Sequence, residues 1–210
     1  MSKRPHLNHA VNVLLKHVAR TMPEFAHLKP ARILVVAGEA RRASRATVKP
    51  LLFTGGHRTD SDGRKKPLVK IQGKRVLYCI TLRPLFFRKS TVRARIATIL
   101  HELFHISHAF DGTLDHLRRH AESGEQFEKA FGPIERRCWR SIPAEVVAPF
   151  AFDGEVRVLQ WLERPESWLP GERASIRRVY TEKQLFEGVV RMKTPRTRAR
   201  VVLPPAPSIH

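Results

Sequence analysis

The spacing of apolar residues in the first quarter of the chain changes from a helical to a strand-like pattern. Leucines and valines recur at helical intervals over residues 7–21 and Pro23 follows, so we expect an amphipathic helix that ends there. Residues 31–38, with the sequence ARILVVAG, are rich in β-branched side chains and end in glycine, which predicts a strand. A second strand is expected over residues 46–53, after a basic segment.

The next part of the chain has the pattern of a loop followed by a hairpin. Residues 54–66 contain no apolar side chain, and glycine, aspartate and serine recur among them, which is typical of a loop. Residues 67–82 contain two apolar runs on either side of Gln72-Gly73-Lys74. Their alternation with other residues predicts a β-hairpin.

Two helices are expected in the middle of the chain. Residues 91–109 follow a favourable N-cap, Ser90 or Thr91, and precede a glycine that favours termination. A second helix is expected over residues 118–131, ending at Gly132-Pro133.

The last third has a weaker pattern. Residues 155–165 indicate a strand, and residues 181–192 indicate a short helix or a strand. Together these elements predict an α+β fold with a small sheet. We expect residues 1–132 to form one domain, residues 133–192 an extension that packs on it, and residues 193–210 a mobile tail rich in basic residues and proline.

The charge of the chain is strongly positive. Lysine and arginine number 39 against 19 acidic residues, which gives a formal net charge of +20 and an isoelectric point of about 11.2. An excess of this size favours contact with polyanions, so nucleic acid is one expected partner.

The remaining composition bears on the cellular compartment. No apolar run reaches the length that spans a bilayer, and the N-terminal segment lacks the continuous apolar stretch of a secretory signal. We therefore expect a cytoplasmic protein without membrane contact. The two cysteines, Cys79 and Cys138, form no CxxC motif, which argues against a disulfide framework and a cysteine-type zinc site.

One short stretch, HELFHISH at residues 101–108, contains the residue types of a metal site. His101 and His105 are four residues apart on the expected helix, so both imidazoles lie on one face and can reach one ion. Histidine nitrogen is a preferred zinc ligand. In this HExxH arrangement Glu102 is the general base that takes the proton of a metal-activated water, so the motif predicts a zinc-dependent hydrolase of peptide bonds.

The third metal ligand is expected from a later element. His108 does not qualify on a continuous helix, because seven residues rise about 10.5 Å, which is too far for a shared ion. After a chain reversal in the FDG sequence, the next segment offers His116, His120 and Glu122. We expect His120 to be the ligand; His116 is the alternative, and a carboxylate such as Glu122 stays open. A closed structural site that uses both later histidines is a further alternative, but it gives Glu102 no role.

Two other questions stay open at this point. Groups that could stabilise an oxyanion are present, but spacing selects none of Tyr78, Tyr180, Arg118 and Arg119. A second function class also fits the composition, namely a basic nucleic-acid-binding protein in which zinc is structural.

The motif and its surroundings resemble a known family. LHELFHISHAFDG is similar to the motif region of the phage-type metallopeptidases, a small zincin group, and FDGTL matches the stretch that follows it. The segment RRHAESGEQF is similar to the family's later segment and places the family histidine on His120. The upstream PARILVVAGEARRASRATVKPLLF is similar to the strand and basic segment before the motif. The resemblance covers residues 5–130, and residues 133–210 find no clear match.

The resemblance implies a minimal zincin-like domain over residues 1–132, with a small β-sheet, an HExxH active-site helix, a Zn²⁺ cofactor and protein or peptide substrates. The sequence DHLRRH departs from the family pattern, because its two histidines leave the ligand register open. The order of strand pair, HExxH helix and returning histidine is also similar to the SprT-like proteases, which act on DNA-bound proteins. That second similarity would suit the positive charge.

Overall fold

The computed structural model describes residues 4–39, 44–115, 124–167, 169 and 179–195 of the 210-residue chain. Its helices are α1 (Leu7–Thr21), α2 (Pro84–Arg88), α3 (Val92–Phe104), α4 (Gly124–Ser141) and α5 (Ala144–Ala151). Its strands are β1 (Ile33–Ala37), β2 (Ala46–Pro50), β3 (Leu68–Ile71), β4 (Lys74–Arg75), β5 (Tyr78–Leu82), β6 (Gly154–Trp161), β7 (Val179–Tyr180) and β8 (Leu185–Met192). Among these described helices, none is long and apolar enough to cross a bilayer.

Five strands form a mixed sheet in the order β2-β5-β1-β6-β8. The central β1 runs parallel to β5 over its whole length, from the pair Ile33–Tyr78 to the pair Ala37–Leu82, and parallel to β6 at Ala37–Gln160. The edge strands β2 and β8 are antiparallel to their neighbours. A smaller sheet has the order β4-β3-β7. The expected α+β fold with a small sheet is therefore confirmed.

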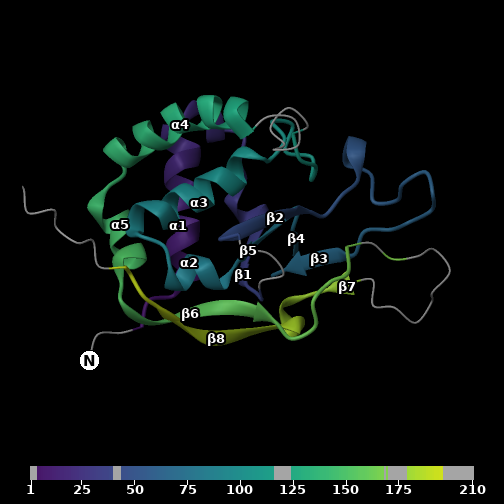
Figure 1. Cartoon of the computed structure of the whole chain (residues 1–210). Coiled ribbons are helices and arrows are strands. Elements are labelled where there is room, and N and C mark those ends of the chain that lie inside the picture. The colour runs from purple at the N-terminus through teal and green to yellow at the C-terminus, as the bar shows by residue number, and fades with distance from the viewer. Residues whose placement is uncertain (1–3, 40–43, 116–123, 168, 170–178, 196–210) are drawn as a thin grey trace, which may run out of the picture.

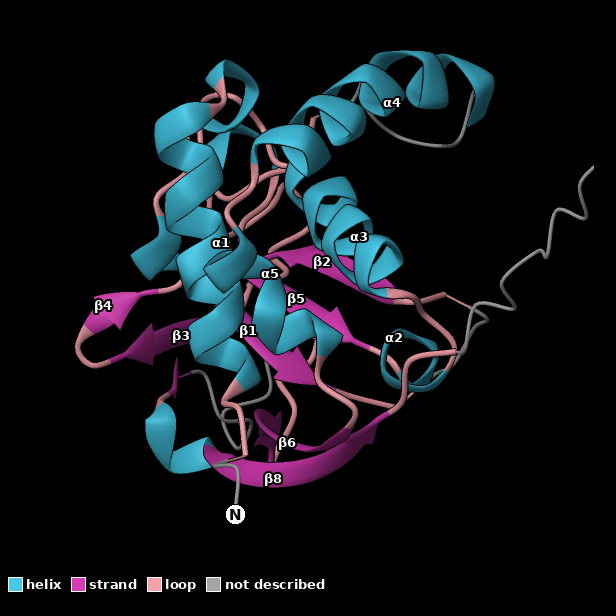
Figure 2. Ribbon diagram, turned by 90° about the vertical axis from the view of Figure 1, so that its left-hand side faces the viewer, coloured by secondary structure: helices cyan, strands magenta, loops and turns pink. Residues whose placement is uncertain are grey.

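The alternation of side chains along β1 divides the interior into two cores. Val35 and Ala37 face a large apolar cluster that includes buried residues of every helix. Leu34 and Val36 face a smaller cluster with Val69 of β3 and residues of β5 and β7. The main sheet therefore separates the helices from the small sheet. Figures 1 and 2 show α1, α3 and α5 on one side of the main sheet.

The expected hairpin over residues 67–82 is only partly correct. Strands β3 and β4 pair around a turn in which Gln72 and Gly73 both have positive φ, as the sequence indicates. The second apolar run then leaves the small sheet, and its later part, β5, joins β1. The reason is burial, because Tyr78, Ile80 and Leu82 are fully covered in the helix-side core.

Helix α4 corrects the expected end of the helix over residues 118–131. The first of those residues lie outside the described ones, and α4 continues from Gly124 through Gly132 and Pro133 to Ser141. Its buried side chains keep helical spacing across the proline: Phe127, Phe131, Ile134 and Cys138. Burying this stripe outweighs the backbone hydrogen bond that proline cannot donate. The expected boundary at 132 and 133 thus falls inside a helix, and the division into domain and extension stays a prediction.

The last third consists of strands that complete the main sheet. The strand expected over residues 155–165 is β6. Residues 181–192 begin with a 3₁₀ turn capped by Thr181 and continue as β8, so the strand alternative is correct there. Of the expected tail, the structure describes Lys193 to Pro195, and the rest lies outside the described residues.

An arginine lies on the buried side of α3. Arg95 has no exposed surface. Its guanidinium donates, at 2.7–3.2 Å, to the carbonyl oxygens of Phe86, Phe87, Phe150 and Lys193 and to the hydroxyl of Thr194. Three of these carbonyls belong to the last turns of α2 and α5, where helical carbonyls lack partners within the helix. The negative ends of two helices therefore replace water around this charge.

We expect Arg95→Met to destabilise the fold by about 2–4 kcal/mol, because several buried carbonyl groups lose their donor while the cost of burying a charge is also relieved. Urea unfolding at neutral pH measures the change. The matched control is Arg93→Met on the exposed side of the same helix, where the ion pair with Glu135 contributes about 0–1 kcal/mol. Similar losses in both variants would show that Arg95 does not anchor the helix.

Candidate metal and catalytic site

Helix α3 begins as the sequence predicts and ends earlier. The hydroxyl of Thr91 accepts an amide hydrogen bond from the first turn at 3.2 Å. The helix stops at Phe104, so the expected helix over residues 91–109 is wrong at its C-terminal end. The chain leaves the helix because Ile106 pairs with Leu114 in an antiparallel bridge, which requires extended backbone.

His101 and His105 are brought together at the end of α3. His101 lies in the last turn, and His105 is the C-cap residue with helical torsions, φ −73° and ψ −15°. Their ring centroids are 4.9 Å apart at an interplanar angle of 81°, and both side chains are half-buried. The early end of the helix therefore leaves the expected neighbourhood of the two imidazoles intact.

Two phenylalanines of α4 restrict the histidine rings. The centroid of Phe127 lies 4.6 Å from that of His101 and 5.0 Å from that of His105, with the latter pair stacked. Phe131 contacts His101 from the next turn at 5.5 Å. From the sequence alone these two phenylalanines had no expected role at the site. Their spacing of four in a helical segment is the signal that could have indicated them.

Glu102 is buried beside the histidine pair, with 8% of its surface exposed. Its Oε2 accepts a hydrogen bond of 2.7 Å from the backbone amide of Val48 in β2. Burial raises the pKa of Glu102 to about 7, while the Val48 amide and the charge of Arg83 act in the opposite direction. The carboxyl group is therefore poised to exchange a proton near neutral pH.

The amide of Val48 can donate to Glu102 because β2 is an edge strand and one of its sides is not paired with another strand. The carbonyl of Arg45 accepts the amide of Arg83 at 2.9 Å, so alternate residues of β2 bond to β5. The residues between them direct their N–H and C=O groups to the open edge, and Val48 is one of these. This backbone donor was not visible in the sequence, because it depends on which side of β2 is paired.

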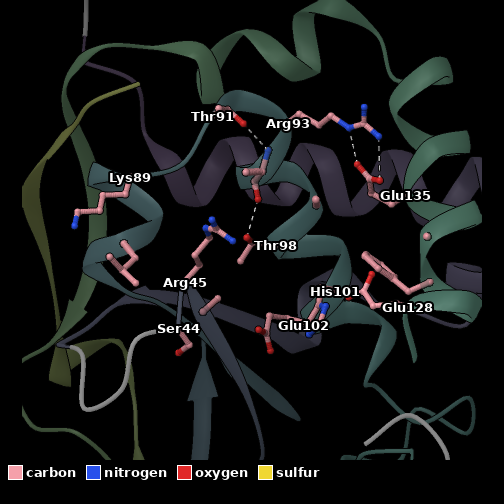
Figure 3. Close-up of a pocket in the computed structure, with 16 residues that line it drawn as sticks. Ser44, Arg45, Lys89, Thr91, Arg93, Thr98, His101, Glu102, Glu128 and Glu135 are labelled. Carbon is pink, nitrogen blue, oxygen red and sulfur yellow. Dashed lines mark hydrogen bonds and ion pairs between the residues drawn. The ribbon is translucent and has the colours of Figure 1, made fainter. Parts of the chain in front are cut away.

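Glu102 and His101 lie at one end of a cleft of about 870 Å³ between α3, α4 and the start of β2. Figure 3 shows Glu128 from α4 near His101, while Arg45 and Lys89 lie toward the other end. The small side chains of Ala94, Ala97 and Thr98 on α3 also line this space. Glu102 is therefore reached through this cleft.

After α3 the chain turns back toward the histidines. Gly112 adopts a left-handed conformation with φ 90°, and Ser107 donates its amide to the Thr113 carbonyl at 3.2 Å. Asp115 then donates its amide to the carbonyl of His105 at 2.9 Å. The predicted chain reversal is therefore present, and it returns the backbone to the second histidine.

The candidates for the third ligand, His116, His120 and Glu122, lie outside the described residues. The described residues on both flanks of that segment are at the histidine pair, Asp115 through the His105 backbone and Phe127 through both rings. Within the described ranges, no group of three histidine, cysteine or acidic side chains could hold a metal ion. The choice among the three candidates stays as the sequence left it.

His108 does not lie on α3, so the helix-rise argument does not apply to it. Its side chain is exposed, and its ring centroid is 4.7 Å from that of His27.

Two of the candidates for oxyanion stabilisation, Tyr78 and Tyr180, contact parts of the structure other than the histidine pair. The hydroxyl of Tyr78 accepts the Gly112 amide and donates to the Thr113 carbonyl, both at 2.9 Å. Tyr180 is buried in the smaller core on the other side of the sheet. Arg118 and Arg119 lie outside the described residues.

The family comparison agrees with the motif. A family model described as "Putative phage metallopeptidase" matches residues 6–133, which is more than half of the chain. The chain belongs to this family. The match contains α1 to α3, the first five strands, the His101–His105 pair and the first half of α4. A metallopeptidase family implies a metal ion and protein or peptide substrates.

No curated protein and no solved structure matches the chain. The similarity to SprT-like proteases therefore stays a prediction.

We expect Tyr78→Phe to loosen the returning loop, because the Gly112 amide and the Thr113 carbonyl lose their shared hydroxyl partner. A loss of about 1–3 kcal/mol in the free energy of unfolding is expected for these buried groups. Amide hydrogen exchange gives the local measurement: the Gly112 amide should exchange faster, while the Ile80 amide in β5 should keep its protection. Unchanged exchange at Gly112 would show that the hydroxyl does not hold the loop.

Proposed function

We propose that this phage-type metallopeptidase depends on zinc, with His101 and His105 as ligands and Glu102 as general base. The observation that carries the proposal is the arrangement of these three residues at the end of α3. Both imidazoles share one face, and the neighbouring carboxyl group is buried at the end of an open cleft. These are the residue types and positions that the HExxH chemistry requires.

The donor set suits zinc. Two imidazoles that lie one helical turn apart and both contact Phe127 are borderline ligands of the kind that zinc prefers. We propose that His120 completes the set, with His116 as the alternative, since the segment that contains both is flanked at each end by residues at the histidine pair. Zinc bound there would supply Lewis-acid polarisation of the scissile carbonyl and acidify a water molecule.

Glu102 would take a proton from that water and return it to the leaving amine. In the metal-free protein burial raises the pKa of Glu102 to about 7, which supports a group that can both take and return a proton. The hydrogen bond from Val48 fixes one carboxyl oxygen and leaves the other for the reaction. A structural zinc in a nucleic-acid-binding protein, the alternative from the sequence, gives this buried carboxyl group no role.

The outer edge of β2 supports a peptide as the substrate. Ala46 lines the same cleft as Glu102. Because the neighbouring Arg45 is hydrogen-bonded toward β5, the backbone groups of Ala46 point away from β5, as those of Val48 do. An extended peptide could therefore add to this edge by main-chain hydrogen bonds.

Glu102→Gln tests the catalytic role. The variant should retain its fold and its zinc but lose at least about 10²-fold in the hydrolysis of a quenched fluorescent peptide mixture, because the amide cannot accept the proton. Glu145→Gln, which changes an exposed carboxylate of α5, is the matched control and should keep its activity. Full activity in Glu102→Gln would remove the glutamate from the mechanism.

Zinc content tests the ligand set. His101→Ala and His105→Ala should lose bound zinc, measured by mass spectrometry of the purified protein after dialysis, and His9→Ala, an exposed histidine of α1, should retain it. Comparing His116→Ala with His120→Ala then identifies the third ligand. Wild-type zinc content in His105→Ala would contradict the assignment.

A further inference from the structure

A cluster of basic side chains surrounds the β3–β4 hairpin. We call it the basic hairpin surface, and it consists of Arg32, Arg58, Lys70, Lys74 and Arg75. Lys70 and Arg75 are direct partners across the two strands, so two like charges occupy opposite positions on one face of the hairpin. Such a pair costs stability in isolation. An anion bound beside the pair would offset that cost.

Two arginines from other segments approach this pair. Arg32 precedes β1, and its Nη1 donates to the carbonyl oxygen of Arg75 at 3.1 Å. Arg58 lies in the loop after β2, and its Nε donates to the carbonyl of Lys66 at 3.0 Å. Burial and the charges of Arg58 and Arg32 lower the pKa of Arg75, so both of these arginines are within electrostatic reach of Arg75.

The acidic residues nearby in sequence do not neutralise this surface. Asp60 and Asp62 both bind Arg64, at 2.6 and 2.9 Å. Among the ion pairs of the described residues, none includes Lys70, Lys74 or Arg75. The carboxylate of Glu182 accepts the amide of Gln72 at the hairpin turn, and it is a single negative charge beside Lys70, Lys74 and Arg75.

We propose that the basic hairpin surface binds the phosphate backbone of nucleic acid. The cations come from both strands of the hairpin and from two other segments of the chain, which suits an extended polyanion better than a single phosphate ion. Arginine forks match phosphate oxygens in geometry, and lysines add point charges.

The surface is separate from the cleft. Figure 2 shows β3 and β4 on the opposite side of the molecule from α3 and α4, and none of its five residues lines the cleft. Nucleic-acid binding at this place is therefore independent of the proposed peptidase chemistry, and either can fail without the other.

Fluorescence anisotropy with a labelled DNA duplex of about 20 base pairs tests the proposal over a series of salt concentrations. Each phosphate contact contributes about 0.9 to the slope of log affinity against log salt. Lys70→Gln/Arg75→Gln should therefore weaken binding at all salt concentrations and lower the slope by about 1.8. Lys70→Gln/Lys74→Gln changes two exposed side chains, so it tests the same surface if the first variant does not fold.

The matched control is Arg136→Gln/Arg140→Gln, which removes two exposed charges of α4 and so has the same net charge. It should keep the wild-type slope. Equal losses in the control and the hairpin variants would mean that binding follows diffuse charge, which overturns the proposal, as would absence of binding by the wild type at low salt. If inorganic phosphate displaced the DNA at a concentration equal to that of the DNA phosphates, the surface would be a single-anion site, and this result would also overturn the proposal.

Discussion

The guanidinium of Arg95 is surrounded by carbonyl oxygens instead of water. Burying an arginine is costly unless every donor is satisfied, so the ends of α2, α5 and β8 must all meet at this point of α3. The same requirement fixes the rotation and the position of α3 along its axis. Since the candidate site is the last turn of that helix, its geometry depends on an interaction two turns away.

A second ionisable group, Glu102, lies on the same buried side, seven residues after Arg95. Glu102 accepts one backbone hydrogen bond, whereas Arg95 donates to five acceptors. Because burial of Glu102 is only partly compensated, its pKa is raised. The two groups show different uses of burial. Full satisfaction makes Arg95 an anchor, whereas partial satisfaction keeps Glu102 able to gain and lose a proton.

The cleft and the basic hairpin surface belong to different sides of the main sheet. The cleft is formed by helices and the β2 edge on the side of the larger core, and the hairpin belongs to the small sheet that covers the other core. Both contain local arrangements that cost stability, a buried carboxyl group in one and opposed like charges in the other. Features of this kind are expected where a protein binds or reacts.

Local sequence determined much of this protein. The N-cap at Ser90 or Thr91 predicted the start of the helix that carries the HExxH motif, and the spacing of His101 and His105 placed both on one face of it. The β-branched run around Val35 likewise predicted a strand, and the glycine at position 112 the return of the chain. The net charge follows from the composition alone.

Tertiary structure decided what depends on contacts between distant segments. The sequence did not show that Val48 would donate to Glu102, because a backbone group becomes available only when one edge of a strand stays unpaired. It did not show that α4 would pass through Pro133, because burial of Phe131 and Ile134 outweighs a local helix breaker. The second half of the expected hairpin joined β1 for the same reason, since burying Tyr78, Ile80 and Leu82 under the helices contributes more free energy than pairing with the nearest strand.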